Sequence, residues 1–158
     1  MRLKTCIEMT IAPSKKNPVL YICGRITAEK GESFVTHIKQ IASDCDQLDL
    51  VMNSEGGSVA VALEIARFML SIDLPIRTVN IGCVDSAAII IYVAASKRIC
   101  DSGATFLFHR ARQECHGCLN ADEFRKMFLE LINDERRIIK HISDQTSLKE
   151  HKIENLML

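Results

Sequence analysis

Short apolar runs alternate with helical patterns through the first half of the chain, and this alternation limits the fold more than any other feature. Residues 19–23, 48–52 and 76–81 are apolar runs of the length typical of buried strands. Apolar residues recur at helical spacing after the first two runs, at Phe34, Ile38, Ile41 and Ala42 and then at Ala62, Ile65, Ala66 and Met69. Strands joined by helical crossovers run parallel, so this order predicts an α/β fold with a parallel sheet.

The pattern continues beyond the third run. Residues 87–95 are almost all apolar and predict a fully buried helix. Residues 98–100 and 104–108 predict two short strands on either side of a turn at 101–103, where Asp, Ser and Gly are typical turn residues.

The C-terminal third predicts a long amphipathic helix over residues 121–143. Asn120 and Glu123 have the spacing of a capping box at its start. Its apolar stripe consists of Phe124, Phe128, Leu131, Ile138 and Ile142. A last short helix is expected within 147–158. The chain has no repeat, low-complexity tract or linker, so we expect a single domain over residues 1–158.

Composition narrows the class of protein. The chain has 158 residues, with 20 Lys and Arg against 20 Asp and Glu, so it has no excess positive charge to attract nucleic acid or an anionic membrane. Its seven cysteines are odd in number and mostly lie in apolar runs, which indicates reduced, buried thiols in a cytoplasm. We find no signal-peptide core and no apolar stretch long enough to span a bilayer. The expected location is cytoplasmic.

Three segments that could carry chemistry each follow a predicted strand: 53–58, 82–88 and 106–109. The carboxyl ends of parallel strands meet at one edge of a sheet, where ligands bind. Ser86 opens a buried helix, whose unpaired N–H groups and positive dipole end suit an oxyanion, and Gly57 is a candidate second donor. Alone, Ser86 is explained as a helix cap, His109 as an ordinary strand-end residue and the Gly-Gly pair as a turn. Together they favour covalent acyl chemistry.

These segments also resemble a known family. The run 19–24, the segment 53–58, Gly82 followed by Ser86-Ala87-Ala88, and then Arg98 and 106–109 are similar to the proteolytic subunit of the Clp protease family over nearly the whole chain. The resemblance implies a Clp/crotonase-like fold of repeated β-β-α units, with a long helix after the strand that bears the histidine.

The resemblance also implies a function and a site. It implies a serine-type endopeptidase that cleaves peptides or unfolded proteins through an acyl-enzyme, with Ser86 as nucleophile and His109 as general base. The N–H groups of Gly57 and Ala87 would form the oxyanion hole. It further implies a homo-oligomeric ring with the 121–143 helix between rings, an AAA+ unfoldase as partner, and no cofactor.

The chain departs from the family at positions beside this site. Glu55 stands where the family has proline, Val84 and Asp85 replace two small residues, and Arg110-Ala111 follows His109 in place of Gln-Pro. We expect the Asp85 side chain to face solvent or to pair with Arg110 or Arg112, because a carboxylate pointing into the site would oppose an oxyanion.

The third member of the triad is not evident. The sequence ends at Leu158, where the family's triad aspartate would fall, and no Asp or Glu matches that position. The candidates for this role are Asn155, Glu154 and Asp144. Asp122 and Asp134 belong to the predicted long helix and are expected to point away from the site.

The motif Cys115-His116-Gly117-Cys118 has the spacing of metal ligands. A closed zinc site needs four ligands, and His109 or Cys100 would have to complete it. We therefore expect two incidental thiols and no metal.

Two alternatives to an active peptidase stay open. The missing acid and the altered neighbours of Ser86 and His109 favour a catalytically weak or inactive subunit with a structural or regulatory role in a ring. The second alternative is a crotonase-like acyl-CoA enzyme with the same fold, which the Ser86 and His109 pair disfavours because that chemistry relies on carboxylates. Fold alone does not decide among the three functions.

Overall fold

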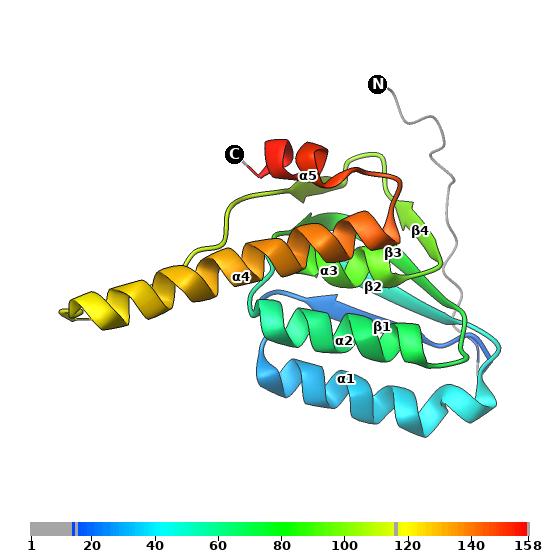
Figure 1. Cartoon of the computed structure of the whole chain (residues 1–158). Coiled ribbons are helices and arrows are strands. Elements are labelled where there is room, and N and C mark those ends of the chain that lie inside the picture. The colour runs from blue at the N-terminus through cyan, green and yellow to red at the C-terminus, as the bar shows by residue number, and fades with distance from the viewer. Residues whose placement is uncertain (1–13, 15, 116, 158) are drawn as a thin grey trace. The chain divides into compact units, whose positions relative to one another are not determined.

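The computed structural model describes residues 14, 16–115 and 117–157. The chain divides into two compact units, Met1–Leu107 and Phe108–Leu158. The first unit contains the parallel sheet and the second contains the long helix (Figure 1). The single domain over residues 1–158 stays a prediction.

The first unit is built on a sheet of five parallel strands, which confirms the predicted α/β class. The strands are β1 (Val19–Cys23), β2 (Leu48–Ser54), β3 (Ile76–Asp85), β4 (Lys97–Cys100) and β5 (Thr105–Leu107). The order is β1-β2-β3-β4, and β5 pairs with β3. The sequential order means that each connection from β1 to β4 moves one strand along the sheet in the same direction.

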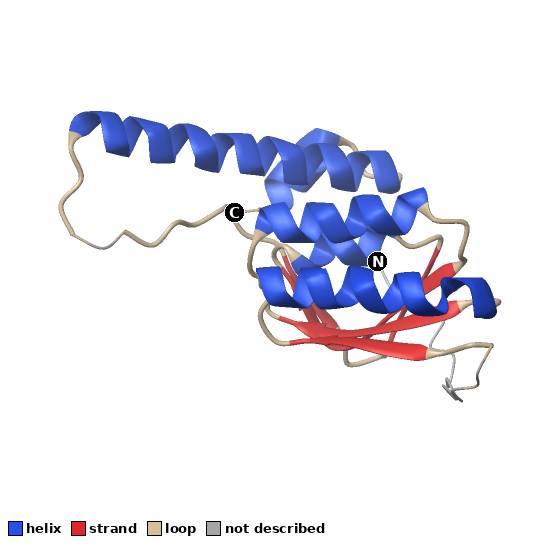
Figure 2. Ribbon diagram, turned by 90° about the horizontal axis from the view of Figure 1, so that it is seen from below, coloured by secondary structure: helices blue, strands red, loops and turns tan. Residues whose placement is uncertain are grey.

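Right-handed crossovers in one direction place their helices on the same face of a sheet. The connecting helices are α1 (Ala28–Ile41), the short 3₁₀ helix η1 (Ala42–Asp44), α2 (Val59–Ser71) and α3 (Ala88–Ala94). Thr27 caps α1 and Ser58 caps α2 through their side-chain oxygens. Helices α1 and α2 lie side by side over one face of the strands (Figures 1 and 2).

Strand β3 is longer than the sequence pattern predicts. The prediction ended it at Ile81, whereas the structure continues it through Asp85. The first half pairs with β4 and the second half with β5. Two asparagine side chains support this exchange, since Asn53 Oδ1 accepts the Cys83 N–H at 3.0 Å and Asn80 Nδ2 donates to the Thr105 carbonyl at 2.9 Å. These bonds replace ladder bonds where the pairing changes.

Helix α3, which follows β3 in the chain, lies in the core. All seven of its residues are buried, as predicted for this apolar segment. Thr78 of β3 is fully buried, and its hydroxyl donates to the Tyr92 carbonyl at 2.9 Å. A buried hydroxyl needs such a partner, and here it ties the helix to the strand that precedes it.

The second unit consists of α4 (Ala121–Gln145) and α5 (Glu150–Leu156), which contact each other. The predicted capping box is confirmed, with the Asn120 side chain accepting from backbone N–H groups and Glu123 reaching back to the Asn120 N–H. Within the described residues, no helix has the length and apolar character that crossing a membrane requires.

A buried ion pair joins two neighbouring strands and gives the first prediction. Asp49 of β2 is buried and receives hydrogen bonds from both Nε and Nη2 of Arg77 on β3. Arg77→Met leaves this carboxylate buried without its cation, so we expect the free energy of unfolding to fall by about 3 kcal/mol. Urea unfolding measures this loss. The exposed Arg67 on α2 supplies the control, and an Arg67→Met loss of equal size would contradict the assignment.

Candidate active site

The most unusual backbone in the first unit is the turn from β3 into α3. Ser86 has a φ of 53°, and it is the only described residue other than glycine with a positive φ. Its N–H donates to the Leu107 carbonyl of β5 at 2.8 Å. A strained turn between a strand and a buried helix is also the place where α/β hydrolases carry their nucleophilic serine.

Two backbone N–H groups near this turn have no hydrogen-bond acceptor among the residues that the structure describes. Ala87 occupies the cap position of α3, where the helix has no carbonyl to receive its N–H. Gly57 pairs with Ile26 in an isolated bridge that uses the Gly56 carbonyl and the Ser58 N–H but not its own N–H. Both groups are therefore able to bind an anionic oxygen.

The turn at Gly56 and Gly57 lies against Ser86 so closely that a side chain cannot fit. A Cβ on Gly56 would lie 2.8 Å from Ser86 Cβ and 2.7 Å from the Asp85 carbonyl oxygen, and Gly56 has a φ of 90°. A Cβ on Gly57 would collide with the Ile26 backbone. Glycine at both positions lets the two backbones approach.

Ser54 holds the Gly-Gly turn in place, a role that the sequence analysis did not assign. Its side chain is fully buried, donates to the Gly24 carbonyl at 2.6 Å and accepts the Gly56 N–H at 3.2 Å. The signal in the sequence is a serine shortly after an apolar run and two residues before the glycine pair. A buried hydroxyl bonded on both sides fixes the loop that carries Gly57.

Asp85 is half-buried and has a hydrogen-bond partner that the sequence analysis did not consider. Its Oδ1 accepts the Leu107 N–H at 2.9 Å. Leu107 therefore bonds to Asp85 through its N–H and to Ser86 through its carbonyl. The reason is the pairing of β5 with the end of β3, which offers this carboxylate a backbone donor. The Asp85 carboxylate thus fixes β5 beside the turn.

Cys83 is the other nucleophilic side chain close to Ser86 in the sequence. Burial raises the pKa of its thiol, and the Asp85 and Glu55 carboxylates raise it further. The thiol therefore stays protonated at neutral pH, and a protonated thiol is a poor nucleophile. Ser86 is the better candidate at this turn.

His109 lies in the second unit, two residues after β5. Its Nδ1 is 2.6 Å from the Arg110 carbonyl oxygen. A carbonyl only accepts hydrogen bonds, so this contact places a proton on Nδ1, and in the neutral imidazole the lone pair is then on Nε2. This tautomer is the one that a general base requires.

The candidates for the third triad member have no hydrogen bond to the His109 ring in the described part of the second unit. Asp144 lies in the last turn of α4, rather than in the predicted turn after it, and pairs with Lys140. That hydrogen bond and the carboxylate charge raise the pKa of Lys140. Glu154 and Asn155 lie on α5 with exposed side chains.

The cysteines are more exposed than predicted. Cys23, Cys115 and Cys118 are exposed, and Cys45, Cys83 and Cys100 are half-buried. The apolar runs place several of them at strand ends rather than in the core. Cys6 and His116 lie outside the described residues. Within the described ones, no three His, Cys, Asp or Glu side chains are grouped as metal ligands.

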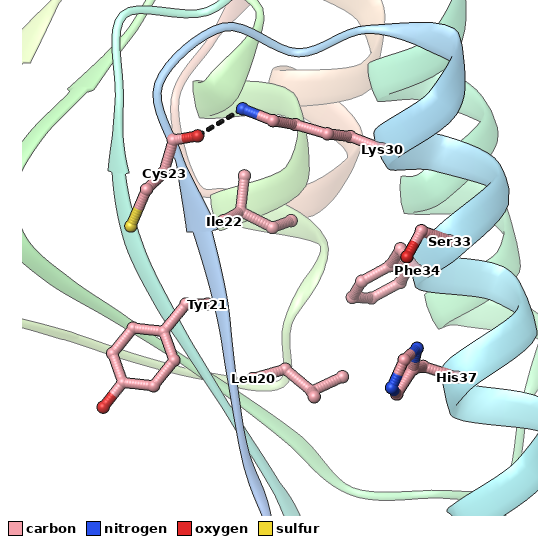
Figure 3. Close-up of a pocket in the computed structure, with 8 residues that line it drawn as sticks. All are labelled: Leu20, Tyr21, Ile22, Cys23, Lys30, Ser33, Phe34 and His37. Atoms are coloured by element: carbon pink, nitrogen blue, oxygen red, sulfur yellow. Dashed lines mark hydrogen bonds between the residues drawn. The ribbon is translucent and has the colours of Figure 1, made fainter.

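A cavity of about 360 Å³ lies elsewhere, between β1 and α1 (Figure 3). Leu20 and Ile22 face Phe34 and His37 across it, while Tyr21 points to the other side of the strand. Lys30 Nζ already donates to the Cys23 carbonyl. The cavity lies between the edge strand β1 and the helix α1, and none of its lining residues belongs to the segments 53–58, 82–88 or 106–109. The turn at Ser86 therefore remains the candidate site.

Comparisons with known proteins agree with the fold and the motifs. Residues 10–158 match the Clp protease family. The chain is 28% identical over 141 residues to ATP-dependent Clp protease proteolytic subunit 3 of Rhizobium meliloti, covering 87% of this chain and 71% of that protein. It is 30% identical over 92 residues to the ATP-dependent Clp protease proteolytic subunit of Paracoccus denitrificans, covering 56% of this chain and 46% of that protein.

A solved structure is also similar. A ClpP1 mutant from Listeria monocytogenes matches with a TM-score of 0.78 at 22% identity, over 91% of this chain and 80% of that one. This match confirms the predicted Clp/crotonase-like fold.

The close approach at Gly56 gives a second prediction. Gly56→Ala forces a Cβ into Asp85 and Ser86 and strains a positive φ, so we expect the free energy of unfolding to fall by at least about 2 kcal/mol. A Cβ on Gly103 would meet nothing within 4 Å. We therefore expect Gly103→Ala to change the free energy of unfolding by less than about 0.5 kcal/mol. Urea unfolding compares the two. Equal stability of both variants would show that the Gly-Gly turn does not lie against Ser86.

Proposed function

Because the chain belongs to the Clp protease family, we propose that it is a serine-type endopeptidase that cleaves peptides or unfolded proteins at Ser86. The observation that carries the proposal is the strained turn at Ser86, beside which the N–H groups of Gly57 and Ala87 have no acceptor among the described residues. The proposed nucleophile and both oxyanion donors thus come from neighbouring turns of the first unit. Preorganised donors of this kind are usually the largest contribution to acyl-transfer catalysis.

The proposed reaction follows from these groups. The Ser86 hydroxyl attacks the peptide carbonyl carbon while His109 Nε2 takes its proton. The carbonyl oxygen becomes an oxyanion bound by the Gly57 and Ala87 N–H groups. As the C–N bond breaks, His109 returns the proton to the leaving amine and an acyl-enzyme on Ser86 remains. A water then repeats the sequence, with His109 as base, and releases the acid.

The third member of the triad stays a proposal, with Asn155, Glu154 and Asp144 as candidates. Loss of the acid in a serine triad costs about 10⁴ in rate, so we expect weak turnover from this chain. We expect little effect of Asp122→Ala or Asp134→Ala, because Asp122 lies in the first turn of α4 and Asp134 pairs with Arg137.

A catalytically weak or inactive subunit with a structural or regulatory role is the second candidate function. The observation that favours it is the hydrogen bond of His109 Nδ1 to a backbone carbonyl rather than to a carboxylate. The crotonase-like acyl-CoA alternative has no such support. Labelling of Ser86 separates a serine peptidase from both alternatives.

The third prediction concerns nucleophile and base. Fluorophosphonate labels an activated serine, so we expect it to modify Ser86, with the site mapped by mass spectrometry. Ser86→Ala removes the labelled oxygen, and His109→Ala removes the base, so both should abolish labelling. The exposed Ser102 and His151 supply matched controls, and their alanine variants should label as the unaltered protein does. Full labelling of Ser86→Ala would sink the assignment.

We also propose that the protein assembles into homo-oligomeric rings, with α4 at the interface between rings. Phe124, Phe128 and Leu129 are exposed by 58%, 52% and 53%, and three large apolar side chains on one helix are costly to leave in water. The relatives' names describe subunits of ATP-dependent proteases, which supports the proposal of an AAA+ unfoldase partner for this chain. The cytoplasmic location stays a prediction.

The fourth prediction tests this assembly. Phe128→Glu places a charge on the apolar surface of α4, so we expect it to shift the mass measured by light scattering towards that of the 17.7 kDa chain. Lys126→Glu changes an exposed charge on the same helix and should leave the mass unchanged. A monomeric unaltered protein at micromolar concentration would contradict the proposal.

A further inference from the structure

Glu135, a residue that the sequence analysis did not consider, contacts the Arg110–Ala111 peptide group, whose carbonyl oxygen lies beside His109 Nδ1. We propose that Glu135 is a positioning residue that acts on His109 through the Arg110–Ala111 peptide group. This inference rests on the proposed function, in which His109 is the general base. It assigns to this chain an acid that does not touch the imidazole.

The contacts form a continuous path within the second unit. His109 Nδ1 lies 2.6 Å from the carbonyl oxygen of the Arg110–Ala111 peptide. The N–H of the same peptide, on Ala111, donates to Glu135 Oε1 at 3.1 Å. The other carboxylate oxygen, Oε2, accepts from Arg110 Nη1 at 3.0 Å. The peptide therefore has the imidazole on its carbonyl side and the carboxylate on its N–H side.

The physical consequence is polarisation of the peptide. A carboxylate that accepts an amide N–H draws positive charge towards the nitrogen and leaves more negative charge on the carbonyl oxygen. That oxygen becomes a stronger acceptor for the Nδ1 proton. It thus favours the tautomer with a free Nε2 lone pair, and it stabilises the imidazolium that forms when Nε2 takes a proton.

The surroundings of Glu135 keep its carboxylate partly shielded from solvent and fixed in position. The Glu135 side chain is 20% exposed, whereas that of Arg110 is 51% exposed, so solvent screens the arginine more than the carboxylate. Glu135 lies in the body of α4, ten residues before its end, which holds its backbone in a regular helix. One of its oxygens accepts the Ala111 N–H and the other accepts from the Arg110 guanidinium, and these two contacts hold the carboxylate beside the peptide.

Other acids on α4 have different partners. Asp134 pairs with Arg137 and Asp144 pairs with Lys140. Ala111 matters as much as the acid, because a proline at this position would have no N–H to donate. Ala111→Pro therefore removes the middle link while leaving Glu135 and His109 in the chain.

The first test measures which nitrogen of the His109 ring carries the proton. Solid-state ¹⁵N spectra of the full chain distinguish the two neutral tautomers, and the His109 signals are assigned by their loss in His109→Ala. We expect the Nδ1–H tautomer to dominate in the unaltered protein. Glu135→Ala and Ala111→Pro should give a mixture of tautomers. Glu135→Gln keeps an oxygen that accepts the Ala111 N–H, so it should largely restore the Nδ1–H form.

A second readout follows the chemistry. We expect Glu135→Ala to slow fluorophosphonate labelling of Ser86 about tenfold, the effect of one hydrogen bond with a charged partner. Glu135→Gln should lie between Glu135→Ala and the unaltered protein. Glu130→Ala is the matched control, since Glu130 is an exposed glutamate on the same helix, and it should change neither readout.

The outcomes separate the two proposals. A Glu135→Gln protein that folds by circular dichroism but shows the same tautomer mixture as Glu135→Ala would overturn the path through the peptide, as would an unchanged tautomer in Glu135→Ala. Absence of labelling in the unaltered protein would instead refute the peptidase proposal. In that case the tautomer measurement alone still decides the role of Glu135.

Discussion

The contact on which the candidate site depends is the approach of the Gly56 backbone to the end of β3. The space between them excludes even a Cβ, since one on Gly56 would lie 2.8 Å from Ser86 Cβ. Two other features support this contact: Ser54 fixes the glycine turn from within the core, and α3 begins at Ala88, two residues after Ser86. This close approach brings the turn that carries Gly57 beside the turn that leads to Ala87.

The pairing of the sheet also changes close to Ser86. β3 exchanges one partner strand for another before it reaches Ser86, and the side chains of Asn53 and Asn80 supply bonds where the regular ladder is interrupted. Asp85 then ties its carboxylate to the β5 backbone. A strand that must both cross the core and present a strained residue at its end needs such support, because strain persists only where surrounding contacts outweigh it.

Much of the fold could be predicted from local patterns, because periodicity and capping depend on neighbours in the chain. The predicted run 19–23 coincides with β1, and the capping box at Asn120 is present. The missed features depend on contacts between distant residues. The extension of β3 requires Asn53, and the partner of Asp85 lies 22 residues away. The link from Glu135 to Ala111 spans 24 residues, so no local pattern could indicate it.

Most of the groups in the candidate site belong to the backbone, so a divergent sequence can keep them. The anion donors at Gly57 and Ala87 and the acceptor at Arg110 are backbone groups, which every residue except proline offers in full. Substitutions at Glu55, Val84 or Asp85 alter side chains around such groups without removing them. What the sequence must conserve for this arrangement is conformational: glycine where a Cβ would collide, and a serine that tolerates a positive φ between a strand and a buried helix. The departures from the family pattern are therefore compatible with the proposed reaction.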